Sequence, residues 1–214
     1  MQLEKDSPEH FYQTRVPNHW NQSLKSQSEA AERGDHEAQR LFQEMVAVQA
    51  TIGITIKQDP SQPSSHYYLN IESGSMSAED APKTPPFLTL EHDLASLQAL
   101  QRESGDSILG FLGALAGQKG DMKLTRSRIE NLGVIEGALL FQLTGEAPMN
   151  LKAQFGPGSE SDEPRCTVRL SQSTYHELKT GSLAPQDVFL NGLVEIEGDM
   201  QMAMQVALAA VAPD

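Results

Sequence analysis

The last predicted helix, over residues 201–211, constrains the fold most because it is apolar on nearly all sides. Gln201 and Gln205 are its two polar residues, and because they lie four apart they form a polar stripe one residue wide. Asp199 follows Gly198 and is placed to cap the helix at its N-terminus. Such a helix has to be covered on several sides, so we expect it to pack inside a core.

The residues before this helix predict a small sheet with a short helix. Pro185 suits the first turn of a helix, Gly192 ends that helix, and residues 193–197 are strand-like. Three earlier segments, residues 137–143, 151–155 and 166–170, carry apolar side chains at every second position from Leu139, Leu151 and Cys166 onward, which is typical of strands.

The order of these motifs resembles that of a known family. Leu178-Lys-Thr-Gly181, the run Pro-Gln-Asp-Val-Phe-Leu-Asn-Gly at 185–192, and Gly198-Asp-Met200 before an apolar, Met-rich helix are similar to the C-terminal half of the sterol carrier protein 2 (SCP2) family. The resemblance covers roughly residues 136–210. It implies a small α/β lipid-binding module, with an apolar tunnel between sheet and helices and no chemistry of its own.

The resemblance also implies which side chains line that tunnel. Methionines on a helix are usually core filler, but a flexible and polarisable lining suits a pocket that accepts apolar chains of varying shape. The residues expected to contact the lipid are Phe141, Leu143, Phe155, Phe189, Leu193, Met200, Met204 and Leu208.

The N-terminal part predicts an arm, a helical pair and a hairpin. Residues 1–16 lack periodicity and are expected to form a flexible arm, whereas residues 17–49 predict two amphipathic helices, the second capped by Asp35. Isoleucines at every second position over 52–56 predict a strand that pairs with a second strand through Tyr67, Leu69 and Ile71. A polar loop over residues 73–86, a strand through Leu88 and Leu90, and a helix beginning at Asp93 complete this part.

The two halves of the chain match each other at a constant offset. Gly120-Asp-Met122 aligns with Gly198-Asp-Met200, an offset of 198 − 120 = 78, and Phe111-Leu112 aligns with Phe189-Leu190 at the same offset. We therefore predict an internal duplication, with a diverged SCP2-like unit over residues 50–132 and an SCP2-like lipid-binding unit over residues 133–214. One fused domain with a continuous sheet is the alternative.

The first unit departs from the family pattern. Residues 114–119 have weak strand propensity and contain Gly117, and residues 123–130 form a charged amphipathic pattern that suits a surface. The fold class expected for the whole chain is therefore α/β (α+β), with an SCP2-like mixed sheet covered by helices and an N-terminal helical pair.

Charge and composition exclude several classes of partner. With 16 basic against 29 acidic residues and a formal net charge of −13, the chain lacks the basic stripe that nucleic acid requires. Contact with an anionic membrane is unfavourable for the same reason, so at most transient membrane contact is expected. No apolar run is long enough to span a membrane, and the N-terminus lacks the pattern of a secretory signal, so a cytoplasmic location is predicted.

The sequence does not indicate catalytic or metal chemistry. Cys166 alternates with Val168 and Leu170, which predicts a buried structural thiol, and none of the six histidines forms a metal-ligand spacing. The acidic residues Glu160, Asp162 and Glu163 lack the glycine and terminal glutamate of a calcium loop. No cofactor and no metal are therefore expected.

The sequence is compatible with three functions. The first is a non-enzymatic carrier of a sterol, fatty acyl chain or other hydrophobic small molecule. The second is an interaction module with a filled tunnel, acting as a homodimer or as a subunit of a lipid-processing assembly. The third, an enzyme acting on such lipids, fits least because nucleophile, base and metal patterns are missing.

Overall fold

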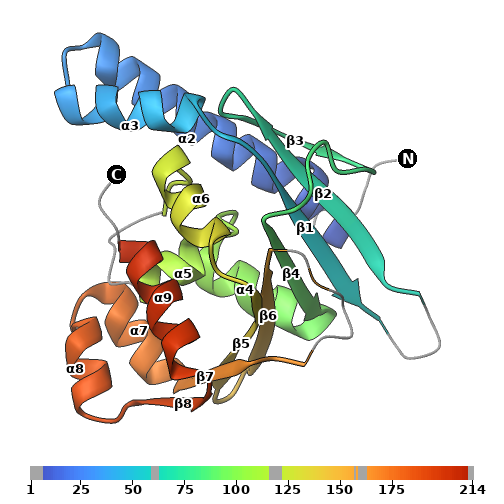
Figure 1. Ribbon diagram of the computed structural model, residues 1–214, viewed down its shortest axis with the longest axis vertical. Coiled ribbons are helices and arrows are strands. Elements are labelled where there is room, and N and C mark those ends of the chain that lie inside the picture. The colour runs from blue at the N-terminus through green and yellow to red at the C-terminus, as the bar shows by residue number, and fades with distance from the viewer. Residues whose placement is uncertain (1–6, 59–62, 116–121, 157, 159–162, 212–214) are drawn as a thin grey trace.

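One eight-stranded mixed sheet runs through the computed structural model, which describes residues 7–58, 63–115, 122–156, 158 and 163–211 (Figure 1). The strands follow each other across the sheet in the order β3-β2-β1-β4-β6-β5-β7-β8. Their bounds are β1 Gln49–Lys57, β2 Ser65–Glu72, β3 Ser75–Glu79, β4 Leu88–Asp93, β5 Gly137–Thr144, β6 Met149–Phe155, β7 Cys166–Ser171 and β8 Val194–Gly198. The mixed α/β class expected from the sequence is confirmed.

The two halves of the sheet contain the same three-strand arrangement. β1 pairs antiparallel with β2 and parallel with β4, and β5 pairs antiparallel with β6 and parallel with β7. In each half a capped helix follows the third of these strands: Asp93 caps α4 (Leu94–Ser104) and Ser171 caps α7 (Gln172–Thr180), at an offset of 171 − 93 = 78. β4 and β6 join the halves, so the sheet is continuous, and the duplication itself stays a prediction.

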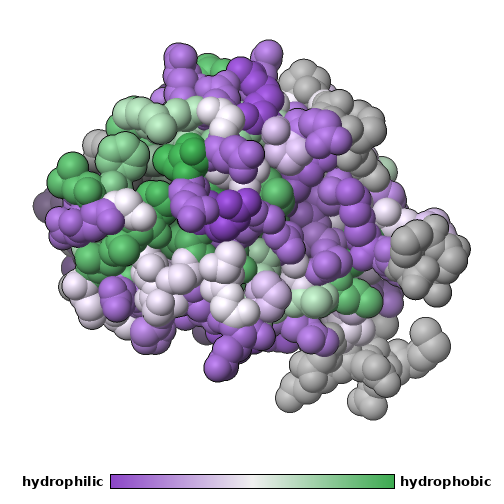
Figure 2. Space-filling model, turned by 90° about the horizontal axis from the view of Figure 1, so that it is seen from below, coloured by the Kyte–Doolittle hydropathy of each residue, from purple (hydrophilic) through white to green (hydrophobic). Residues whose placement is uncertain are grey.

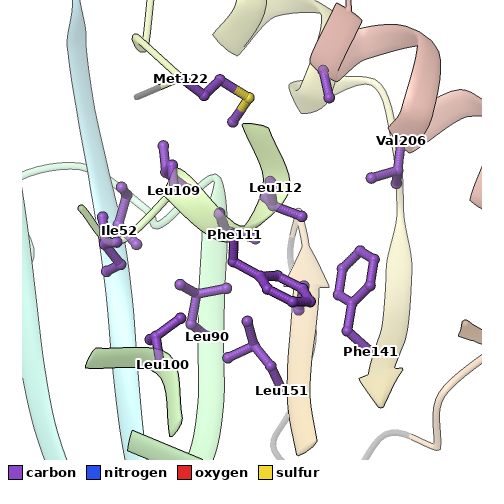
Figure 3. Close-up of a cluster of buried hydrophobic side chains, with 14 of the residues drawn as sticks. Ile52, Leu90, Leu100, Leu109, Phe111, Leu112, Met122, Phe141, Leu151 and Val206 are labelled. Carbon is purple, nitrogen blue, oxygen red and sulfur yellow. The ribbon is translucent and has the colours of Figure 1, made fainter. Parts of the chain in front are cut away.

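The core lies on one face of this sheet. Alternate residues such as Ile52, Leu90 and Leu151 point toward α4, α5 (Gly110–Leu115) and α9 (Met200–Val211), whose apolar side chains cover them (Figure 3). The opposite face of the same strands carries polar residues, among them Thr55 and Glu91. The period-2 pattern of the sequence therefore separates a helix-covered face from a polar one.

The N-terminal arm was predicted incorrectly for residues 7–16. From Pro8 the chain is helical without a break, through α1 (Pro8–His10), a π-helical turn (Phe11–Arg15) and α2 (Val16–Glu32). Phe11 and Tyr12 are fully buried, so tertiary packing holds a segment that has no periodic pattern of its own. Residues 1–6 of the expected arm lie outside the described residues.

The helical pair expected over residues 17–49 is present as α2 and α3 (His36–Val46). The carboxylate of Asp35 accepts hydrogen bonds from the backbone N–H groups of Glu37 and Ala38, as expected for a cap, and Gly34 takes a positive φ of 91° between the helices. The pair lies beside β3 (Figure 1), where Trp20 Nε1 donates to the carbonyl oxygen of Gly74 at 2.7 Å.

A strand was missed in the polar loop predicted over residues 73–86. Ser75–Glu79 form β3, which pairs with β2 from Tyr68↔Glu79 to Glu72↔Ser75. Its outer edge is held by Asn21, whose side-chain amide donates to the carbonyl of Met76 and accepts from its N–H, both at 2.9 Å. The side-chain amide of Asn21 on α2 thus makes the hydrogen bonds that a neighbouring strand would make. The local sequence pattern does not predict this contact, because its partners are far apart in the chain.

The C-terminal part follows the sequence prediction except at its last helix. α6 (Arg126–Gly133), α8 (Pro185–Leu190) and β8 precede α9, and the side chain of Asp199 caps α9 by accepting from the backbone N–H of Met202 at 3.0 Å. The expectation that α9 is covered on several sides holds in part, because α5, α6, β7 and β8 all contact this helix. One side stays open among the described residues: Met200, Met204 and Leu208 are 48%, 53% and 64% exposed. In the segment of weak strand propensity, residues 114–119, Ala114 and Leu115 belong to the end of α5, and residues 116–119 lie outside the described residues.

Candidate ligand pocket

A cavity of about 200 Å³ lies between the C-terminal half of the sheet and the helices above it. Three neighbouring strands form its floor. Because side chains of a strand alternate between faces, each contributes two residues two positions apart: Leu139 and Phe141 from β5, Val168 and Leu170 from β7, Val194 and Ile196 from β8. The strand register places Phe141 beside Val168 and Val168 beside Ile196, so the floor is continuous.

Helices complete the walls of the pocket. α9 supplies the largest share, and α5, α7 and α8 close the remaining sides. The wall residues are Leu112, Leu115, Leu178, Pro185, Val188, Phe189, Ala203, Met204, Val206, Ala207 and Ala210. Small alanines on α9 leave the space that a larger side chain would fill. Every lining side chain among the described residues is apolar.

The pocket opens between α8 and α9. Phe189 and Met204 both line it, yet they are 54% and 53% exposed, so each has one side in the cavity and the other in water. Both side chains can turn about single bonds without disturbing the backbone, and Met adapts its shape at small cost. These two residues therefore define the mouth.

The structure brings three of the eight predicted tunnel residues to this pocket: Phe141, Phe189 and Met204. Leu143 and Phe155 are buried in the core and do not line the cavity. Leu193, Met200 and Leu208 are exposed and do not line the cavity, and Leu208 lines a separate groove between α6 and α9. The floor residues of β7 and β8 were not predicted as lining. Their alternation was visible in the sequence, but the strand register that sets them beside Phe141 was not.

A salt bridge fixes the start of α9 and with it one wall of the pocket. Arg165 Nη2 lies 2.6 Å from Asp199 Oδ2, and the backbone N–H of Asp199 donates to the carbonyl of Arg165 at 2.8 Å. The backbone N–H of Met202 at the helix start, together with the Arg165 guanidinium, holds the pKa of Asp199 below its usual range. Gly198 has a φ of 89°, and a side chain there would collide with the Arg165 carbonyl.

The polar groups near the pocket serve structure. Cys166 is buried, as predicted, and burial raises the pKa of its thiol, which disfavours the reactive thiolate. Among the described residues no group of His, Cys, Asp and Glu could hold a metal ion. In that same part of the chain, no helix combines the length and apolar character needed to cross a membrane.

Fold and cavity together define a class: a mixed α/β protein with an entirely apolar pocket between a sheet and its covering helices. Residues 124–210 match the model of the SCP-2 sterol transfer family. The resemblance to sterol carrier protein 2 that the sequence motifs indicated is thereby confirmed over this segment. All the lining residues except Leu112 and Leu115 lie within it. A search among curated proteins finds no match.

Solved structures of sterol carrier proteins are among the similar folds, at low scores. Apo sterol carrier protein 2 from Yarrowia lipolytica is 16% identical with a TM-score of 0.30, over 41% of this chain and 79% of that one. Sterol carrier protein 2 like 2 from Aedes aegypti is 15% identical with a TM-score of 0.28, over 38% and 87%. Sterol carrier protein domain 2 of Helicoverpa armigera is 14% identical with a TM-score of 0.21, over 97% and 94%.

Proposed function

We propose that the protein is a non-enzymatic carrier that binds the apolar part of a sterol, fatty acyl chain or similar lipid in this pocket. The observation that supports it is the cavity of about 200 Å³ with exclusively apolar walls. A buried apolar cavity of about 150 Å³ already takes up benzene, so a hydrocarbon group of this size fits without polar contacts. The match of residues 124–210 to a sterol transfer family agrees with this use.

Apolar surface alone provides enough free energy for such a ligand. Each Å² of hydrocarbon removed from water contributes about 25 cal/mol, so the buried part of a lipid needs no hydrogen bond to be held. A whole lipid is larger than the cavity as it stands, because pockets for drug-sized ligands are about 300–1,000 Å³. We expect Phe189 and Met204 to turn outward on binding, which lets a chain extend through the mouth while the polar head stays in water.

Substitution at the mouth tests the proposal. In Met204→Trp the larger side chain can enter the cavity, so delipidated protein should bind parinaric acid, a fluorescent fatty acid, at least about tenfold more weakly. The unfolding free energy should change by less than about 1 kcal/mol, because the added volume occupies space that is already empty. Fluorescence titration and urea melts measure the two quantities.

The matched control is Gln205→Trp. Gln205 is the next residue on α9, is exposed, and does not line the pocket, so the same new side chain there should leave fatty acid binding unchanged. Full binding by Met204→Trp would contradict the proposed pocket. Unfolding of Met204→Trp, or wild-type protein that binds no parinaric acid after delipidation, would instead favour a filled interior and an interaction module.

A further inference from the structure

The outer side of α9 is an apolar stripe that no described residue covers. Met200, Met204 and Leu208 follow each other at intervals of four residues and therefore lie on one side of the helix. All three are about half exposed or more. A helix that is apolar on nearly all sides is normally buried on all of them. We therefore expect a partner to bind the exposed side of α9.

The exposed stripe continues onto the end of α8. Phe189, Leu190 and Leu193 are 54%, 78% and 42% exposed. Because Phe189 and Met204 both line the pocket, the two apolar surfaces meet at its mouth. We call the six residues Phe189, Leu190, Leu193, Met200, Met204 and Leu208 the mouth patch. They account for six of the eight large apolar side chains that are exposed in the described part of the chain.

Figure 2 shows this concentration as green side chains gathered on the side of the molecule that carries α8. Elsewhere the visible face is mostly purple or pale, with one smaller green area on the opposite side. Contiguous exposed apolar surface rimmed by polar residues marks a site of contact with another protein or a membrane.

Charge separates these two kinds of partner. Segments 188–194 and 200–211, which supply the whole patch, contain no charged residue, although the chain carries a formal net charge of −13. The charged residues that flank these segments in the sequence are the acidic Asp187, Glu195, Glu197 and Asp199, of which Asp199 is paired with Arg165. A second copy of the chain on this surface would bring acidic flanks together and would close both mouths. A neutral lipid surface carries no net charge to oppose them and leaves a path for the ligand.

We propose that the mouth patch docks on a zwitterionic lipid bilayer and that the ligand passes between bilayer and pocket there without crossing water. This proposal rests on the proposed carrier function, and it adds the partner that contacts the mouth of the pocket. Aromatic and aliphatic side chains enter the boundary between headgroups and acyl chains, and the absence of charge in the patch avoids the cost of desolvating charged groups. Anionic lipid should not strengthen this contact, because the patch has no basic residue to pair with it.

Vesicle flotation of the full-length protein tests the docking surface. Wild type should float with phosphatidylcholine vesicles, and adding phosphatidylglycerol should leave the bound fraction equal or lower it. Leu190→Gln should lower vesicle partition by about tenfold, because burial of this side chain is lost and Leu190 lies outside the pocket wall. Leu94→Gln is the matched control, since Leu94 is 47% exposed on α4, far from the patch in sequence and fold, and it should float like wild type.

Binding of parinaric acid added without vesicles separates this proposal from the carrier function. Wild type, Leu190→Gln and Leu94→Gln should bind parinaric acid equally, which would show that the pocket is intact in all three. If wild type floats but binds no fatty acid, the carrier function fails while the docking surface stands. If Leu190→Gln floats like wild type, or if flotation requires phosphatidylglycerol, the proposed surface is wrong. A wild-type dimer in sedimentation velocity that Leu190→Gln makes monomeric, without flotation of either, would assign the patch to a second copy.

Discussion

The ring of His92 is held neutral at the junction of the N-terminal helix and the sheet. It is 4% exposed; its Nδ1–H donates to the carbonyl of Asp93 at 2.9 Å, and its Nε2 accepts from the hydroxyl of Tyr12 at 2.6 Å. Burial lowers the pKa of His92, with Asp93 and Glu91 opposing part of that shift. Burial raises the pKa of Tyr12, which keeps its hydroxyl a donor.

This neutral ring predicts a loss of stability in mild acid. Because the folded-state pKa of His92 lies below its unfolded value of about 6.5, the unfolded chain takes up the proton first as pH falls. The contribution to the unfolding free energy is complete above pH about 6.5 and is lost as pH drops through that value toward the folded pKa. Urea melts between pH about 7.5 and about 5 measure it.

The control substitutions are His92→Gln and His36→Gln. The first should remove most of the pH dependence in that window and lower stability at every pH, because Tyr12 loses its partner. His36 is exposed at the start of α3, so its replacement should keep the wild-type profile. An unchanged profile in His92→Gln would show that another group titrates there.

Among the elements, the helix from Pro8 onward carries more of the fold than its sequence suggests. Phe11 is fully buried, its ring meets that of Tyr12 edge to face at 4.9 Å, and the Arg15 guanidinium lies 5.3 Å from its centre. We expect Phe11→Ala to lower the unfolding free energy by about 3–5 kcal/mol, as for other buried Phe truncations.

Gln13→Ala supplies the comparison for Phe11→Ala. Gln13 is exposed on the same segment, so its truncation should change stability by less than about 0.5 kcal/mol. Denaturant melts of both variants measure the effect. Equal and small losses in the two variants would mean that this segment is loose after all.

The elements that the sequence predicted are those with local signals. Asp35 and Asp199 are predicted as helix caps, and Asp93 as the start of a helix, from their neighbours alone. Alternation over residues 52–56 and 67–71 predicts the first hairpin. The sequence did not predict β3 or the first helical turns, because these elements are stabilised by contacts between residues distant in sequence, such as Asn21 with Met76 and Tyr12 with His92. Three of the eight residues expected to line a tunnel line the cavity, and the floor of the cavity depends on strand register, which alternation in the sequence does not give.

The exposure of α9 shows a different limit. Its apolar composition predicts a helix that is covered on several sides, and Met202, Val206 and Ala210 are buried. The expected tunnel residues Met200 and Leu208 lie on the exposed side of the helix, because the direction in which a side chain faces depends on how the helix packs and not on its composition. Their role in binding a ligand stays a prediction.

At the scale of the molecule, the continuous sheet couples the two predicted units. β4 pairs with β6 over Leu88↔Phe155 to Glu91↔Lys152. The ring of Phe111, in α5, lies 5.6 Å from that of Phe141 and 5.1 Å from that of Tyr175. The first unit thus supplies both a strand neighbour and part of the core of the second. The similarity between the two halves of the sequence predicts a boundary between the units at residues 132 and 133. It does not predict the contacts that the two units share.

We therefore expect residues 133–214 alone to be poorly soluble or molten. Without the first unit, β6 becomes an unpaired edge strand, the aromatic contact of Phe111 is lost, and Leu112 and Leu115 no longer close the pocket. The fragment should lack a cooperative thermal transition in near-ultraviolet circular dichroism and should bind a dye for exposed apolar surface, whereas the full chain should melt sharply. Mixing it with residues 1–132 should restore some cooperativity, because the missing strand and helices return together. A sharp melt of the isolated fragment, with parinaric acid binding equal to that of the full chain, would show instead that the second unit is autonomous and that the contacts across β4 and β6 are dispensable.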